Sequence, residues 1–129
     1  MRDQKNSSQL DFLTIMIDMV KKSKCKCIIN ISSEAGSIEN ALRVCEYGYC
    51  MSKAALNMGT KILQNAFPEI KFYAIHPGWM KTPQGYAGAT KECSPQQEPS
   101  DTAEKLFSIA ENKTYNYIFG DFEGNKMPW

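Results

Sequence analysis

The stretch CIINIS, residues 27–32, is short, nearly continuous in apolar character and rich in isoleucine. Such a run is typical of a strand that is buried on both faces, as the strands of a parallel sheet are. Two further runs of strand length follow it, IKFYAIH at residues 70–76 and YNYIFG at residues 115–120. The sequence therefore predicts three strands, and the character of the first indicates that they are parallel.

Segments with helical periodicity of apolar residues precede the first predicted strand and lie between the predicted strands. Between residues 10 and 20 the polar side chains fall on one narrow stripe, which predicts a helix with a wide buried face; the stripe consists of Asp11, Thr14 and Asp18. A second helix is predicted over residues 47–67, because a proline follows it and apolar residues mark one of its faces, namely Met51, Ala55, Met58 and Ile62.

A third helix is predicted from about Thr102, because Asp101 can cap it and Glu104 completes a capping box. Its expected core face consists of Ala103, Leu106, Phe107 and Ala110. The alternation of helix and strand predicts βαβ units with right-handed crossovers, and hence one α/β domain over residues 1–129. In an open parallel sheet of this kind, a ligand binds beyond the carboxyl ends of the strands.

The composition of the 129 residues narrows the classes of function. Fifteen Lys and Arg nearly cancel fourteen Asp and Glu, which argues against a nucleic-acid surface. No apolar run is long enough to span a bilayer, and the N-terminus lacks the apolar segment of a signal peptide, so we expect a cytoplasmic protein without a membrane partner. Five cysteines fit a reducing compartment. Cys25 and Cys27 lack two further ligands nearby, so no metal site is expected.

Tyr49 and Lys53 are the pair of residues that raises a catalytic question. They lie four positions apart on the second predicted helix and therefore share a face. An ammonium beside a phenol favours the phenolate, and a phenol tuned in this way can pass a proton to or from an alcohol oxygen. Ser33, at the end of the first strand, could donate a hydrogen bond to the same oxygen. The spacing alone also occurs by chance, and the alternative is two polar residues on the solvent side of a helix.

Four segments in order resemble the second half of a short-chain dehydrogenase/reductase. They are IINISSEAGSI at 28–38, YGYCMSKAALN at 47–57, HPGWMKTP at 76–83 and FGDFEGNKMPW at 119–129. The resemblance is best to the carbonyl-reductase branch that includes the sniffer-like and C-factor-like enzymes. It implies a three-layer αβα, Rossmann-like parallel sheet of which this chain holds the last three strands, without the N-terminal nucleotide-binding half.

The resemblance also implies catalytic roles for four residues. Tyr49 matches the general acid/base of the family. Lys53 matches the lysine that lowers the pKa of this tyrosine and holds the nicotinamide ribose. Ser33 matches the serine that polarises the substrate carbonyl. Asn6, in the helix before the first strand, is the candidate for the asparagine that holds a water relay beside the lysine.

A second group of residues is implied to contact the cofactor. Pro77, Gly78 and Thr82 match positions that contact the nicotinamide carboxamide, and Met80 occupies the position of the usual aliphatic residue. Residues 83–99, rich in Gly, Pro, Gln and Ser, are expected to form a mobile substrate lid. No glycine-rich turn follows the first strand to admit a pyrophosphate, so most of an NAD or NADP cofactor would be bound by the missing half.

Two functional hypotheses follow from different classes of protein. The first is the catalytic half of an NAD(P)-dependent reductase that acts on a ketone or aldehyde, with Tyr49 as proton donor. The second is a non-catalytic module that acts only through association with a partner. The helices around residues 8–22 and 47–67 are the candidate surface of a homo-oligomer. His76 is interpreted as a histidine that ends a strand, without a catalytic role.

Overall fold

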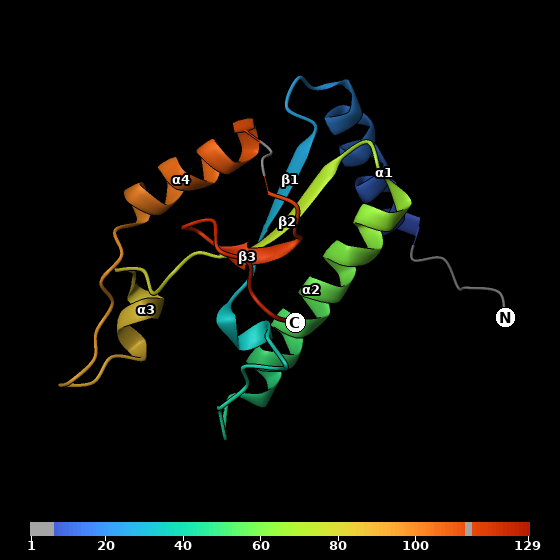
Figure 1. The fold of residues 1–129 in the computed structure, drawn as a ribbon. Helices are drawn as coiled ribbons and strands as arrows, with labels where there is room; N and C mark the ends of the chain where they lie inside the picture. The colour runs from blue at the N-terminus through green and yellow to red at the C-terminus, as the bar shows by residue number, and fades with distance from the viewer. Residues whose placement is uncertain (1–6, 113–114) are drawn as a thin grey trace, which may run out of the picture.

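The computed structural model describes residues 7–112 and 115–129, and helices and strands alternate along them. Figure 1 shows three strands at the centre of the molecule with the long helices around them. In chain order the elements are α1 (Ser7–Lys22), β1 (Cys27–Ile31), the 3-10 helix η1 (Glu34–Gly36), α2 (Tyr47–Ala66), β2 (Lys71–His76), α3 (Pro83–Ala87), α4 (Pro99–Asn112) and β3 (Phe119–Asp121).

The three strands form one parallel sheet in the order β1-β2-β3. Ile28 lies opposite Phe72, and Ala74 lies opposite Phe119. The predicted fold class, an α/β protein with part of a Rossmann-like sheet, is therefore confirmed. Asn6, one of the four predicted catalytic residues, lies outside the described residues.

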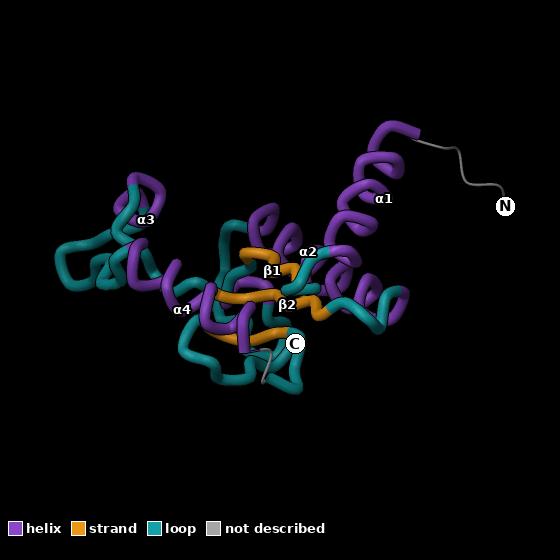
Figure 2. The backbone as a smooth tube through the Cα atoms, turned by 90° about the horizontal axis from the view of Figure 1, so that it is seen from above, coloured by secondary structure: helices purple, strands orange, loops and turns teal. Residues whose placement is uncertain are grey.

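One face of the sheet packs against α1 and α2. Phe72 of β2 and Ile70 just before it are completely or almost completely buried there, together with Ile17 of α1. Leu63 of α2 and Val20 of α1 pack against this cluster. Figure 2, which views the molecule from above, shows the strands between helices on either side.

The other face of the sheet packs against α4. Tyr73 and Ile75 alternate with Phe72 along β2 and therefore point to the opposite side, where they meet Ile109 of α4. Tyr115 packs on Tyr73 edge to face, with 6.5 Å between ring centroids. The chain thus has a small core on each face of its sheet.

The two edges of the sheet differ. The outer edge of β3 is covered by the C-terminal segment, because the N–H of Met127 donates to the carbonyl of Phe119 over 3.0 Å and Lys126 bridges to Gly120. β1 forms the other edge, and its last residue, Ile31, is exposed. The expectation of a first strand that is buried on both faces is therefore only partly met.

The start of α4 corrects the expectation for the third helix. The helix begins at Pro99, so Asp101 lies in its first turn rather than at the N-cap. The buried residues of α4 are Thr102 and Ile109, whereas Phe107 of the expected core face is 71% exposed. The stripe that faces the sheet runs through Thr102, Leu106 and Ile109, at positions i, i+4 and i+7, and Phe107 falls beside it.

Two other helices bury less than their patterns predict. In α1, Ile17 is buried, but Ile15 and Met19 are exposed. In α2, the predicted apolar face is exposed at Met51, Met58 and Ile62. The apolar faces of these helices are wider than the surface that the three-stranded sheet and the loop after β1 cover, so part of each face remains exposed. None of the helices in the described part of the chain is long and apolar enough to cross a membrane.

Candidate active site

The candidate site lies where the strands β1 and β2 end. Ser32 and Ser33 follow β1 directly, and the N–H of Ser32 donates to the carbonyl of Ile75 over 2.8 Å. His76 ends β2, and Asp121 ends β3 in register with it. Because parallel strands end at one edge of their sheet, the polar residues that follow them become neighbours.

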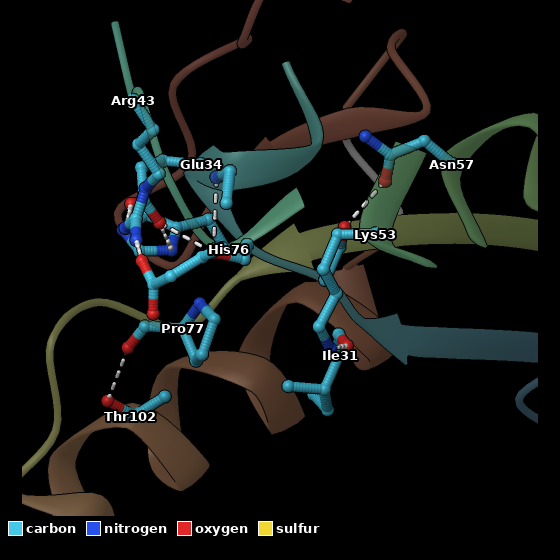
Figure 3. A network of polar contacts seen from close by, with 12 residues as sticks. Ile31, Glu34, Arg43, Lys53, Asn57, His76, Pro77 and Thr102 are labelled. Carbon is cyan, nitrogen blue, oxygen red and sulfur yellow. Dashed lines mark hydrogen bonds and ion pairs between the residues drawn. The ribbon is translucent and has the colours of Figure 1, made fainter. Parts of the chain in front are cut away.

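Tyr49 and Lys53 lie on one face of α2, as their spacing predicts. The ammonium nitrogen of Lys53 is 5.7 Å from the ring centroid of Tyr49. The same nitrogen donates to the carbonyl of Ile31 over 3.0 Å, which fixes the first turns of α2 against the end of β1. Figure 3 shows Lys53 reaching toward Ile31. The geometry of the pair is as expected, and the catalytic roles of its members stay predictions.

A buried set of hydrogen bonds holds the loop after β1 against α2. The hydroxyl of Ser32 donates to Oδ1 of Asn57 over 2.6 Å, and Nδ2 of Asn57 donates to the carbonyl of Gly36 over 3.2 Å. A Cβ atom on Gly36 would lie 2.9 Å from the carbonyl carbon of Lys53. This close contact between the loop and α2 fixes where Ser33 stands relative to the helix that carries Tyr49.

Ser33 is buried, and both kinds of bond that its hydroxyl can form are in use. The hydroxyl donates to Oε2 of Glu34 over 2.5 Å. It also accepts from the N–H of Ala35 over 3.2 Å, which makes Ser33 the N-cap of η1. The side chain predicted to polarise a carbonyl therefore has a carboxylate partner in this structure.

Glu34 connects Ser33 with two further groups. The guanidinium of Arg43 binds Oε1 of Glu34, and Nδ1 of His76 lies 3.7 Å from Oε2. Burial raises the pKa of the Glu34 carboxyl, but the hydrogen bonds from Ser33 and Arg43 outweigh it and leave this pKa below its usual value. Glu34 is therefore a carboxylate at neutral pH. Figure 3 shows Glu34, Arg43 and His76 gathered on one side of the site.

His76 is half-buried at the end of β2. Its Nδ1 atom is buried and has no hydrogen-bond partner among the described residues. Burial lowers the pKa of the imidazole, and the carboxylates of Glu34 and Asp121 offset part of this effect. The ring is therefore neutral at pH 7 and faces a carboxylate that it does not touch.

The predicted cofactor residues follow His76 along the chain. Pro77 is buried, and its carbonyl accepts from the hydroxyl of Thr102 over 3.1 Å. Gly78 has a φ of 81°, and a Cβ there would lie 2.8 Å from the Phe122 ring. This position therefore suits only glycine.

The last two predicted cofactor residues have contacts within their own segment. Met80 bridges to Gln97, and the hydroxyl of Thr82 accepts from the N–H of Gly85 over 3.1 Å as the N-cap of α3. The expected lid, residues 83–99, thus contains the short helix α3. The structure brings Ser33 and His76 together through Glu34, and brings Tyr49 and Lys53 together on α2, whereas Met80 and Thr82 are held by neighbours of their own.

Sequence reasoning missed three residues that organise this site. Asn57 is one helical turn beyond Lys53, so its place on the same stripe as Tyr49 was a usable signal. Glu34 directly follows Ser33, and nothing in the sequence indicates that it accepts the proton of that serine. Arg43 lies in a loop, and no pattern in the sequence predicts its pairing with Glu34. In the residues that the structure covers, no group of three His, Cys, Asp or Glu side chains could hold a metal ion.

Comparison with known proteins gives matches in sequence. A family model described as short chain dehydrogenase matches residues 10–92. C-signal of Myxococcus xanthus is 25% identical over 118 residues, which cover 88% of this chain and 68% of that protein. An uncharacterized oxidoreductase of Schizosaccharomyces pombe is 25% identical over 126 residues, which cover 86% of this chain and 50% of that protein.

Solved structures match as well. The carbonyl reductase Sniffer of D. melanogaster has a TM-score of 0.63 and 32% identity, over 80% of this chain and 41% of its own. An NADPH-bound carbonyl reductase from chicken fatty liver has a TM-score of 0.71 and 31% identity, over 96% of this chain and 54% of its own. The chain thus spans about half the length of these two structures.

Proposed function

Because this chain belongs to the short-chain dehydrogenase family, a family of oxidoreductases, we propose that it is the catalytic half of a nicotinamide-dependent carbonyl reductase. Its substrate would be a small ketone or aldehyde. The observation that carries the proposal is the placement of Tyr49 and Lys53 on one face of α2, beside the strand end that bears Ser33. The carbonyl reductases among the similar structures support the choice of reaction.

In the proposed reaction, the protein residues handle the substrate oxygen. The hydroxyl of Ser33 would donate a hydrogen bond to the carbonyl oxygen, which polarises the C=O bond. A bound nicotinamide cofactor would supply the hydride to the carbonyl carbon. Tyr49 would give its phenolic proton to the oxygen as negative charge develops there, and the Lys53 ammonium would stabilise the phenolate that remains.

The residues present fit the nicotinamide end of such a cofactor. An ammonium has three donors, and Lys53 uses one of them on the carbonyl of Ile31, which leaves donors for ribose hydroxyls. Within residues 7–112 and 115–129 no strand leads into a glycine-rich turn that opens a helix, so we propose that the pyrophosphate is held by a segment outside them. The choice between NAD and NADP stays open.

The experiment that tests this proposal is thermal unfolding of the chain with NADPH and with NADH. A ligand that binds only the folded state raises the midpoint, by the equivalent of about 2.7 kcal/mol at a hundred times its Kd. We expect one of the two cofactors to raise the midpoint for the wild type and for Lys61→Ala, an exposed lysine further along α2. We expect a smaller rise for Lys53→Ala. Equal midpoints with and without either cofactor at millimolar concentration would contradict cofactor binding by this chain.

A second candidate function is that of a module that works through association with another protein subunit. The exposed apolar residues of two helices favour it: Ile15 and Met19 on α1, and Met51, Met58 and Ile62 on α2. These helices are the ones predicted to form an oligomer. Sedimentation of the wild type and of the double variant Met51→Lys, Met58→Lys tests the idea. An oligomer that the variant converts to a monomer supports it, and a wild-type monomer at high concentration rejects self-association.

The cellular compartment is part of the same proposal. Cys25, Cys45, Cys50 and Cys93 form no disulfide. Cys45 and Cys93 are exposed, and exposed thiols persist in a reducing compartment. We therefore place the protein in the cytoplasm as part of the proposed function.

A further inference from the structure

The single hydroxyl proton of Ser33 is already engaged, although its proposed role requires that proton for the substrate carbonyl. A serine hydroxyl carries one proton, and here Ser33 donates it to Oε2 of Glu34 over 2.5 Å. The N–H of Ala35 occupies a lone pair of the same oxygen. A substrate carbonyl that needs the Ser33 proton must therefore take it from a carboxylate. Oxygen–carboxylate hydrogen bonds of this length are among the strong ones.

The contact of Glu34 with Arg43 can persist when the hydrogen bond between Glu34 and Ser33 breaks. Arg43 binds Oε1, the oxygen that Ser33 does not use. The carboxylate can therefore rotate about this contact while its charge stays paired. The side chain of Glu34 is also 44% exposed, whereas Ser33 is buried, so the mobile partner of the bond is Glu34.

His76 can serve as a second donor to Oε2 when its neutral ring carries the proton on Nδ1. Nδ1 of His76 lies 3.7 Å from Oε2 and has no hydrogen-bond partner among the described residues. An N–H···O bond needs about 2.9 Å, so a movement of about 1 Å would close the gap. A buried polar atom without a partner is costly, which means that closing the gap would offset the loss of the bond to Ser33.

We propose that the Glu34 carboxylate alternates between two donors, the hydroxyl of Ser33 and the Nδ1–H of His76. In the first position the Ser33 hydroxyl donates its proton to Glu34 and cannot donate to a ligand. In the second position the Ser33 proton is free, and a substrate carbonyl can take it. Glu34 and His76 are positioning residues in this scheme, because they act on the substrate only through Ser33. The substrate part of the inference rests on the proposed function, whereas the alternation itself does not.

The chain offers a direct spectroscopic test, because His76 is its only histidine. The ¹³C and ¹⁵N signals of the imidazole can be followed against pH by NMR without a cofactor. Removing the Ser33 hydroxyl by Ser33→Ala mimics its release, so Glu34 should move to His76. The approach of a carboxylate favours the charged ring, and we expect the titration midpoint of His76 to rise by about one pH unit.

Further variants assign the shift to Glu34. In a Glu34→Gln background, Ser33→Ala should leave the His76 midpoint unchanged. Asp121, the other carboxylate that faces the ring, is present in all these proteins and contributes equally to each. Ser37→Ala is the matched control, because Ser37 is a buried serine of the same loop that caps the N–H of Asn40 and should not influence His76.

Two results of these titrations would overturn the alternation of Glu34 between Ser33 and His76. A midpoint that does not move in Ser33→Ala, or a shift that persists without Glu34, overturns the alternation. Should Ser33→Ala fail to fold, Ser33→Cys keeps the volume and weakens the donor, and a smaller rise in the midpoint is then the supporting result. None of these measurements needs a cofactor. A failure of cofactor binding would therefore reject the proposed nicotinamide contacts of this chain and leave this result standing.

Discussion

Gly36 shows at the scale of a residue how closely the loop after β1 approaches α2. A Cβ at this position would lie 2.8 Å from Nδ2 of Asn57 and 2.9 Å from the backbone of Lys53. Because helix backbone cannot yield as a flexible side chain can, the strain would pass to the contact between the loop and α2. That contact sets the distance between the serine and tyrosine sides of the site.

We therefore expect Gly36→Ala to lower the free energy of unfolding by about 1–3 kcal/mol, the usual cost of overpacking a close contact. Gly59→Ala on α2 is the control. A Cβ there would meet nothing within 4 Å, and alanine favours a helix over glycine by about 1 kcal/mol. Urea unfolding of both variants measures the difference. Equal stabilities would mean that the loop and α2 are farther apart than described.

The pH dependence of stability follows from Glu34 and His76. Folding depresses the pKa of both groups, so the unfolded chain binds more protons than the folded chain in the range where each titrates. Both contributions are therefore present at neutral pH and are lost on acidification. The contribution of His76 to the free energy of unfolding is lost as the pH falls through about 6.5, and the contribution of Glu34 is lost below about 4.5.

We expect the free energy of unfolding to fall as the pH is lowered from 7 to 4, with a shallower fall below pH 4.5 in Glu34→Gln. Unfolding in urea at a series of pH values provides the measurement. Glu104→Gln, an exposed residue of α4, is the control and should follow the wild type. A wild-type stability that rises on acidification would show that the signs of these two contributions are wrong.

At the scale of the element, α4 shows what the sequence could and could not predict. Its existence and approximate place were clear from the apolar periodicity. Its first residue was not, because the pattern of Asp101 and Glu104 looks like a capping box although both lie inside the helix. The predicted buried face was also wrong at Phe107, because the stripe that faces the sheet includes the polar Thr102, which a search for apolar residues passes over.

In the strands and in the site, features with a local sequence pattern could be predicted, and contacts between distant residues could not. The run at 27–32 identified β1, because a buried strand has a local signature. Most of YNYIFG is not strand, and β3 is only Phe119–Asp121. The pairing of Glu34 with Arg43 depends on a loop that returns nine residues later. No local pattern records such a contact, whereas the helical spacing of Tyr49 and Lys53 does.

Thr102 anchors α4 to the loop that carries the predicted cofactor residues. Its buried hydroxyl donates to the carbonyl of Pro77 over 3.1 Å. Thr102→Val keeps the shape and leaves that carbonyl without its partner, so we expect a loss of about 1–2 kcal/mol in the free energy of unfolding. Ser108→Ala, an exposed change on the same helix, should cost much less. Thermal or urea unfolding of the two variants compares them, and a neutral Thr102→Val would argue against the anchor.

At the scale of the whole molecule, the chain has two small cores and one uncovered side. The core beneath α1 and α2 and the core beneath α4 each contain few fully buried side chains. The C-terminal segment covers the β3 edge, and Trp129 stacks on Phe119 with 5.7 Å between ring centroids. Trp129 also lines one pocket with Met58 of α2, so the C-terminal segment reaches the apolar face of that helix. The rest of the apolar faces of α1 and α2 stays exposed.

In the proposed function, Tyr49 gives the proton in a carbonyl reduction assisted by Lys53 and Ser33. The most direct measurement is carbonyl-dependent oxidation of NADPH or NADH by the assembled enzyme, with Tyr49→Phe compared with the wild type. We predict that the variant loses at least about a hundredfold in turnover, the typical contribution of general acid catalysis, while its cofactor Kd stays within about twofold. Turnover in Tyr49→Phe close to that of the wild type would contradict it.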